Sequence, residues 1–406
     1  MKIGFVTRKN APKRGGDLTA LYCFYEGLKE IGQDVIIGRS VEELLHADFV
    51  FLSNTSFDLK EDFATIQKYG KRFGVVGFHS DRPKYYNPCY GFANFVGLCL
   101  SQTEGFSFYR LEQLLEDPEI IQFFSYAPPP IFEENYPILE KAEVCIATSP
   151  TEAATMQRDS PGCNAQVVYL ECGIPDALTM RKNNAFLQWT GLKEGEYILQ
   201  VGRIELRKNQ LASILATKDL KMPLVLIATE TFYPAYEQMC LEAIRKWRKA
   251  PTFVISQNLE CIQDGNLRIL RMPEGRELSQ EMLISAYQNA GAHLHPAFCE
   301  LPGLIYLEAA KLGVPTIASE WTAIKDYFTD PVMDDRIVYA LPHHINTLTE
   351  LTVQQFGKKF DPNIDHPLFR RTKVDVAQDF LAALKNIPKL QRLRKELPLN
   401  LRRRRY

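Results

Sequence analysis

The sequence lacks the features that mark several large classes of protein. None of its apolar runs reaches the roughly 20 residues that a membrane-spanning helix needs. The chain begins at Met1 directly with a predicted strand, without the apolar core and cleavage site of a signal peptide. Its nine cysteines form no CxxC pair, and its seven histidines are widely spread. We therefore expect free thiols packed in the core, a cytoplasmic protein and no metal site.

Excess charge of one sign is also missing, except at the C-terminal end. The chain has 48 Lys and Arg against 49 Asp and Glu, which argues against nucleic-acid binding by its main body. Residues 388–406, in contrast, carry eight Lys or Arg and a single acid, Glu396. This tail could hold the protein peripherally on an anionic membrane, at the inner membrane surface. The alternative is a solvated tail, and Pro398 would interrupt any continuous amphipathic helix within it.

The length and the order of the predicted elements indicate a two-domain α/β protein. At roughly 100–200 residues per domain, 406 residues suit two domains. Strand-like and helix-like segments alternate almost throughout, as in doubly wound sheets. We expect an N-terminal Rossmann-like domain over residues 1–177, a second over 178–365, and a helix with the basic tail over 366–406. The expected strands lie at 3–7, 34–37, 48–52, 73–79, 144–148, 167–170, 197–201, 224–228, 252–255, 267–270, 292–295 and 316–318.

The segment after the strand at 292–295 places two carboxylates eight residues apart. Glu300 follows the end of the strand, and Glu308 lies on a predicted helix that begins near Gly303 and Leu304. The carboxyl end of a parallel strand is the ligand-binding edge of such a sheet. Free N–H groups at the start of the helix favour phosphate, and carboxylates beside them suit sugar or ribose hydroxyls. The alternative is an ordinary strand–turn–helix with two surface glutamates.

Basic residues follow the first predicted strand of the second half. Gly202 would let backbone approach a ligand, and Arg203 with Lys208 could straddle a diphosphate. A solvated basic loop is the alternative. In the first half, Gly15 and Gly16 lie between a strand and a helix, where free N–H groups could cradle a phosphate or simply form a tight turn. They form neither a P-loop nor a complete G-x-G-x-x-G pattern.

Residues 201–209 and 300–308 together resemble the V-G-R-x-x-x-x-K and E-x7-E elements of retaining GT-B glycosyltransferases of family 4. The resemblance is strong over residues 197–325 and weaker, but in the same order, over 1–175. It implies a GT-B fold, with two Rossmann-like doubly wound domains facing a central cleft and a C-terminal helix. It also implies a retaining hexosyltransferase that uses a nucleotide-diphosphate-sugar donor and a glycan or lipid-linked acceptor, without a cofactor or a metal ion.

The resemblance also assigns roles to individual residues. Arg203 and Lys208 would stabilise the departing diphosphate in place of a metal ion, Glu300 would contact the transferred sugar, and Glu308 would bind the ribose. His79, which we expect at the end of a buried strand, matches a family histidine that faces the sugar, although a packed core histidine is the alternative. The implied catalytic residues are Glu300, Arg203, Lys208 and His79, and the donor-binding residues are Gly15, Gly16, Gly202, Met272, Pro273, Gly303, Leu304 and Glu308. Backbone at Met272 and Pro273 would read the nucleobase.

The sequence departs from the family after the first glutamate. Leu301 and Pro302 replace the usual small–aromatic pair, and Pro302 has no N–H to donate. The acidic residue often found after 316–319 has no clear counterpart, so the donor sugar stays open. The chain contains no Asp-x-Asp pair, the metal–diphosphate device of the other common glycosyltransferase fold. A non-hydrolysing nucleotide-sugar epimerase and a catalytically silent nucleotide-sugar sensor remain alternatives.

Overall fold

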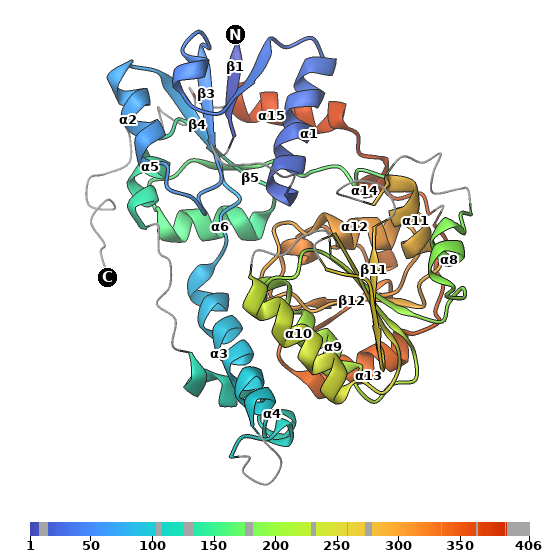
Figure 1. The fold of residues 1–406 in the computed structure, drawn as a ribbon. Helices are drawn as coiled ribbons and strands as arrows, with labels where there is room; N and C mark the ends of the chain where they lie inside the picture. Colours follow the sequence, from blue (N-terminus) through green and yellow to red (C-terminus); the bar gives the residue numbers. More distant parts are fainter. Residues whose placement is uncertain are drawn as a thin grey trace. The chain divides into compact units, whose positions relative to one another are not determined.

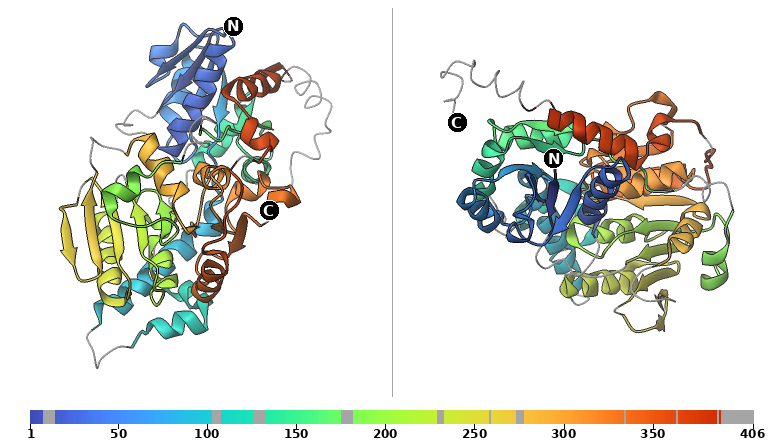
Figure 2. Two further views of the ribbon diagram at one scale, coloured as in Figure 1. Left: turned by 90° about the vertical axis from the view of Figure 1, so that its right-hand side faces the viewer. Right: turned by 90° about the horizontal axis from the view of Figure 1, so that it is seen from above.

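The computed structural model divides the chain into two compact units (Figures 1 and 2). The first unit comprises residues 1–80, 130–171 and 370–406, and the second comprises residues 81–129 and 172–369. Within these units the structure describes residues 1–7, 15–102, 108–125, 133–174, 182–228, 233–257, 259–272, 278–333, 335–362, 364–385 and 387. None of the helices in these ranges combines the length and the apolar composition required to cross a bilayer.

The first unit is built on a six-stranded parallel sheet in the order β2-β1-β3-β4-β5-β6. Its strands are β1 (Ile3–Val6), β2 (Val35–Gly38), β3 (Phe49–Ser53), β4 (Arg72–Val76), β5 (Cys145–Ala147) and β6 (Ala165–Val167). The helices are α1 (Gly16–Glu30), η1 (Glu42–Leu44), α2 (Lys60–Lys68), η3 (Glu133–Asn135), α5 (Tyr136–Lys141), α6 (Pro150–Asp159) and α15 (Lys373–Lys385). β1, β3 and β4 are almost fully buried, which explains their near-continuous apolar sequences.

Helix α15, close to the end of the described chain, packs on the first unit beside α1 (Figure 1). Phe380 of α15 lies 4.9 Å from Phe51 and 5.2 Å from Phe24, measured between ring centroids. Gly27 of α1 permits this approach, because a Cβ there would lie 2.2 Å from the backbone oxygen of Lys373. The last helix is therefore part of the first unit's core.

The second unit is built on an eight-stranded sheet in the order β10-β11-β9-β8-β7-β12-β13-β14. All neighbouring strands are parallel except β10, which pairs antiparallel with β11. The strands are β7 (Ile198–Val201), β8 (Leu224–Ile227), β9 (Thr252–Ser256), β10 (Ile262–Asp264), β11 (Leu267–Arg271), β12 (Ala292–His295), β13 (Thr316–Ser319) and β14 (Ile337–Ala340). All residues of the central strands β7, β8 and β12 are buried, because helices cover both faces of a parallel sheet of this kind.

Two groups of helices belong to the second unit. Those from the main part are α8 (Ala185–Thr190), η4 (Leu206–Lys208), α9 (Gln210–Ala216), α10 (Pro234–Trp247), α11 (Gln280–Gln288), α12 (Leu304–Lys311), η5 (Ala323–Asp326), η6 (Pro331–Met333) and α13 (Ile345–Gln355), followed by α14 (Pro367–Arg370) at its end. Residues 81–129 supply α3 (Arg82–Ser101), α4 (Leu111–Glu116) and η2 (Pro118–Phe124).

The helices of residues 81–129 join the second unit through apolar contacts that are distant in sequence. The rings of Phe92 on α3 and Phe298 after β12 lie 5.9 Å apart. Gly97 of α3 lies against Met239 of α10, which would be 3.0 Å from an added Cβ. Within the segment, α3 and η2 pack closely at Gly91, where an added Cβ would lie 2.1 Å from the backbone oxygen of Ile121. The segment is thus packed as part of the second unit.

The predicted fold class is confirmed, whereas the expected domain boundaries differ from the observed division in two segments. Residues 81–129 group with the second unit instead of the first, and residues 370–406 group with the first unit instead of forming a separate part. Strands β10 and β14 were not predicted. β10 is an exposed three-residue strand without an apolar run, so its sequence carries little strand signal.

Candidate active site in the second unit

The candidate site lies where the strand order of the second sheet changes direction. β7 and β12 are neighbours and run parallel, with β8 on one side and β13 on the other. The chain leaves β7 at Gly202 and leaves β12 after His295, in the loop that carries Glu300, so both connections start at the same edge of the sheet. Such a switch point is the usual ligand site of an open α/β sheet.

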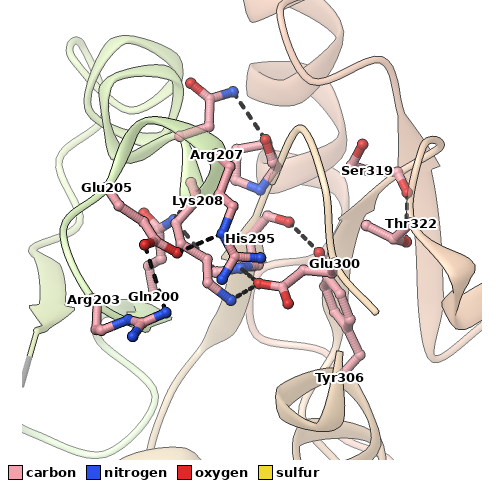
Figure 3. Close-up of polar contacts among 12 residues, drawn as sticks. Gln200, Arg203, Glu205, Arg207, Lys208, His295, Glu300, Tyr306, Ser319 and Thr322 are labelled. Atoms are coloured by element: carbon pink, nitrogen blue, oxygen red, sulfur yellow. Dashed lines mark hydrogen bonds and ion pairs between the residues drawn. The ribbon is translucent and has the colours of Figure 1, made fainter. Parts of the chain in front are cut away.

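Lys208 and Glu300 meet at this edge in a buried ion pair, although 92 residues separate them. Lys208 comes from η4 after β7, and Glu300 comes from the loop after β12 (Figure 3). Their side chains are 13% and 7% exposed. Burial lowers the pKa of Lys208 well below its usual value, and Arg207 lowers it further, whereas Glu205 raises it. The two predicted residues are therefore brought together, and each partly neutralises the other.

His295, the last residue of β12, holds the other side of the Glu300 carboxylate. Its Nε2 lies 3.2 Å from Glu300 Oε1, and its Nδ1 lies 3.4 Å from Gln200 Nε2 (Figure 3). Gln200 donates through that same nitrogen to the Lys208 carbonyl at 2.9 Å. Nδ1 of His295 is therefore the acceptor and Nε2 carries the proton that is donated to Glu300. Burial, and next the charge of Lys208, keep the pKa of His295 well below its usual value, so the imidazole is neutral.

Two arginines share the carboxylate of Glu205 in this cluster. Glu205 lies 2.8 Å from Arg207 and 3.6 Å from Arg203, measured between the paired nitrogen and oxygen atoms. Burial raises the pKa of Glu205, but Arg207 and Arg203 outweigh it and the net shift is downward, so this carboxylate is charged. Three basic side chains, Arg203, Arg207 and Lys208, thus lie with Glu205 and Glu300 at this edge of the sheet. Basic side chains gathered here suit an anion such as a diphosphate.

Two glycines adopt backbone conformations that other residues avoid. Gly202 has φ 144° and leaves β7, and Gly303 has φ 84° and precedes α12. A Cβ on Gly303 would lie 2.6 Å from the Tyr306 ring, so both conformation and space favour glycine. No side chain caps α12 at Gly303, and the helix starts at Leu304. The first N–H groups of α12 are therefore without intrahelical partners, as an anion-binding helix start requires.

Glu308 lies on α12, about one turn after the helix begins at Leu304. It is half-buried, and burial raises the pKa of its carboxyl to about 7, with a smaller opposing effect of the Tyr287 hydroxyl. Near neutral pH this carboxyl is therefore divided between its acid and its ionised form. A group in that state can donate to or accept from a hydroxyl.

His79 lies in the first unit, three residues after β4 ends, and is 6% exposed. Its Nδ1 lies 2.8 Å from the Thr55 hydroxyl, and its Nε2 lies 2.9 Å from an oxygen of Asp159. Its backbone N–H donates to Glu152, whose buried carboxylate also accepts from Thr148. Both ring nitrogens are thus engaged inside the unit, which is the packed arrangement that the sequence left as an alternative.

The remaining predicted positions are only partly described. Gly15 precedes α1 and accepts a hydrogen bond from the Thr19 hydroxyl, and among the described residues no atom outside the helix and the chain neighbours lies within 4 Å of a Cβ on Gly16. Residues 8–14 of the glycine-containing loop lie outside the described residues. Met272 follows β11 and is buried, whereas Pro273 lies outside the described residues.

Sequence reasoning missed several polar residues that complete the cluster, namely Gln200, Glu205, Arg207 and Asn209. Asn209 ties together the two loops of this edge, because its amide donates to the carbonyls of Pro296 and Pro342 at 2.9 and 2.7 Å. His295 is buried, and it also contacts Glu300. A glutamine and a histidine facing inward from buried strands are the signal that could have found this network.

Comparison with known proteins identifies the fold. Neither the protein-family models nor the curated proteins compared with the sequence gave a match. Solved structures do match over nearly the whole chain. Sucrose-phosphate synthase from Thermosynechococcus elongatus has a TM-score of 0.57 at 15% identity, covering 97% of this chain and 98% of its own. The chain has the GT-B fold.

Two further structures with this fold contain ligands. An α,α-trehalose-phosphate synthase (UDP-forming) from Burkholderia xenovorans, in complex with glucose-6-phosphate, has a TM-score of 0.54 at 10% identity and 95% and 96% coverage of the two chains. HepE from Anabaena, in complex with UDP and glucose, has a TM-score of 0.51 at 14% identity and 95% and 99% coverage. At these identities the likeness establishes the fold alone.

Proposed function

We propose that this protein is a retaining glycosyltransferase that uses a nucleotide-diphosphate-sugar donor and needs no metal ion for transfer. The observation that carries the proposal is the Lys208–Glu300 ion pair at the switch point, beside Arg203 and the start of α12. A diphosphate leaving group needs positive charge, and a sugar needs hydrogen-bond acceptors. The proposal is also supported by the shared fold of HepE, which is in complex with UDP and glucose, and of the trehalose-phosphate synthase, which is in complex with glucose-6-phosphate.

The ion pair suggests how these side chains would respond to a donor. In the free protein, Lys208 and Glu300 satisfy each other and remain mostly buried. A donor diphosphate would draw Lys208 and Arg203 toward its oxygens, where they and the N–H groups of Gly303 and Leu304 offset the charge that develops as the sugar departs. Glu300 would then be released to bind hydroxyls of the transferred sugar, with His295 holding its other side.

The other donor contacts follow from position. Glu308 would bind the ribose hydroxyls, and the backbone at Met272 and Pro273 would face the base. We also propose Gly15, Gly16 and His79 as donor-site residues, on the basis of the family resemblance. For His79 to contact a sugar, one of its ring nitrogens would have to give up its hydrogen bond, either that with Thr55 or that with Asp159.

A panel of nucleotide sugars tests this function. The full-length chain is incubated with UDP-, GDP- and ADP-sugars, and released nucleoside diphosphate is measured by chromatography, with Glu300→Gln and Lys208→Ala as controls. We expect slow release from one donor by the unaltered chain and much less from either variant. Binding without release from any donor would indicate a silent sensor, and interconversion of the sugar without release would indicate an epimerase.

We also propose that the acceptor is a glycan or lipid-linked molecule and that the basic tail contacts an anionic membrane. Residues 388–406 lie outside the described residues, so this proposal rests on their charge. Each basic residue near such a surface contributes on the order of 1 kcal/mol. Deleting residues 388–406 should abolish co-sedimentation with anionic liposomes at low salt. Equal, low binding by both forms would leave a solvated tail.

A further inference from the structure

A second cluster of chemically competent side chains lies in the second unit, outside the residues assigned to the donor. Glu119 of η2 and the adjacent pair His343 and His344, just before α13, each offer one ligand atom, and these atoms lie within 4.8 Å of one another. Nε2 of His343 lies 3.0 Å from Oε1 of Glu119, and Nε2 of His344 lies 3.5 Å from the same oxygen. Two imidazoles thus converge on one carboxylate from a segment 224 residues away.

The hydrogen bonding of this cluster is incomplete. The 3.5 Å separation is too long for a good hydrogen bond, and among the described residues the buried Nε2 of His344 has no hydrogen-bond partner. His343 is 2% exposed, and its Nε2 faces the Glu119 carboxylate. Buried polar atoms normally have partners, so the orphaned Nε2 of His344, which lies beside the same carboxylate, needs an explanation.

The types and separations of the ligand atoms suit a zinc ion. Zinc prefers imidazole nitrogen and carboxylate oxygen at about 2.0–2.2 Å in a tetrahedron, which places neighbouring ligand atoms about 3.4 Å apart. The two measured separations, 3.0 and 3.5 Å, bracket that value. Magnesium and calcium prefer all-oxygen sites and are poorly matched to two imidazoles. With three protein ligands, water would supply the fourth.

The surroundings fix one ligand and leave the others able to adjust. The His343 ring lies parallel to Phe298 at 6.5 Å and 5.6 Å from Trp321, measured between centroids. The side chains of His344 and Glu119 are 30% and 53% exposed, so small rotations can close the site. Nearby, Asn346 donates to the Leu115 carbonyl at 2.9 Å, so the two segments already approach each other here.

We propose that Glu119, His343 and His344 form a zinc-binding site that fastens the helical segment 81–129 to the loop before α13. The ion would bind two parts of one unit that are far apart in sequence, in addition to the Phe92–Phe298 contact. Because none of the three ligands is assigned to the donor, zinc would act on the stability of the second unit and not on the transferred sugar.

Zinc binding to the full-length chain tests the proposal. Cys261 is the exposed cysteine among the described residues and can bind zinc by itself, so all proteins carry Cys261→Ser. After chelator treatment and dialysis, zinc chloride is titrated calorimetrically into this protein, into Glu119→Gln and into His344→Ala. Glu116→Gln, an exposed glutamate at the end of α4, and His46→Ala, an exposed histidine of the first unit, are matched controls. The buried His343 is left intact, because replacing it risks unfolding.

We expect one equivalent of zinc in the parent and both controls, with at least tenfold weaker binding in Glu119→Gln and His344→Ala. Zinc should raise the melting temperature and slow amide hydrogen exchange in η2 only where it binds, and magnesium should do neither. Bound cobalt should give the visible spectrum of a four-coordinate ion, which the two ligand variants lose. Absence of stoichiometric zinc binding in the parent, or equal binding by the two ligand variants, would overturn the proposal.

Discussion

The Lys208–Glu300 ion pair should be measurable as a coupling energy in the free protein. The perturbation is a double-mutant cycle that combines Lys208→Met, which keeps the length of the side chain, with Glu300→Gln, which keeps its shape. Both side chains are buried, so neither charge can be rehydrated fully when its partner is removed. The cycle isolates this interaction from the separate effects of the two substitutions.

The surroundings of each residue set the magnitudes. Removing one partner of a buried ion pair costs about 3–5 kcal/mol, but Glu300 keeps the hydrogen bond from His295, so Lys208→Met should cost about 2–3 kcal/mol of unfolding free energy. Glu300→Gln should cost less, about 1–2 kcal/mol, because Lys208 already has a lowered pKa and can shed its charge. The double variant should cost less than the sum, by at least about 1 kcal/mol.

Tryptophan fluorescence reports the unfolding of the second unit, which contains the ion pair. All three tryptophans (189, 247 and 321) belong to that unit. Urea unfolding of the four proteins at one pH then gives the coupling. The pair Lys193–Glu196 is a matched control, since it lies in the same unit at 3.7 Å with side chains 79% and 53% exposed. Its cycle should give under about 0.5 kcal/mol. A Lys208–Glu300 coupling no larger than the control would refute the buried ion pair.

Four further predictions concern the candidate active site. Arg203→Ala and Lys208→Ala should each weaken calorimetric binding of the matching nucleoside diphosphate by roughly 1.5–3 kcal/mol, and unchanged affinity in both would remove them from the diphosphate site. Glu300→Gln should lower turnover far more than donor affinity, whereas Glu308→Gln should chiefly weaken nucleotide binding; swapped phenotypes would reverse the two roles. Since the pKa of Glu308 is raised to about 7, its folded-state protonation stabilises the protein fully below the unfolded value, near 4.3, and this stability is lost as pH rises through 7. Glu308→Gln should abolish that part of the pH dependence of the unfolding free energy, and an unchanged profile would contradict the shift. Transfer should also survive excess EDTA, tested in His344→Ala so that zinc does not enter; loss of activity that manganese or magnesium restores would disprove metal independence.

Most strands of both sheets could be predicted because they are buried on both faces and read as short apolar runs. The pattern of apolar residues could not show, however, that residues 81–129 belong to the second unit. Their helical pattern shows that one face is apolar, but only the folded chain shows that Phe92 meets Phe298 and that Gly97 meets Met239. Likewise, Gly27 gives no sign in the sequence that α15 will pack against it.

The candidate site shows the same division between local signal and tertiary contact. Arg203, Lys208 and Glu300 could be proposed from the sequence because they follow predicted strands and match the spacing of the V-G-R-x-x-x-x-K and E-x7-E elements. Gln200 and His295 could not be assigned, because a polar residue inside a buried strand indicates only that a partner exists, not which one. Glu119 and His343 are a stronger case, since their 224-residue separation leaves no spacing to recognise. Polar residues in apolar segments therefore indicate that a polar network exists, and only the folded chain shows which residues belong to it.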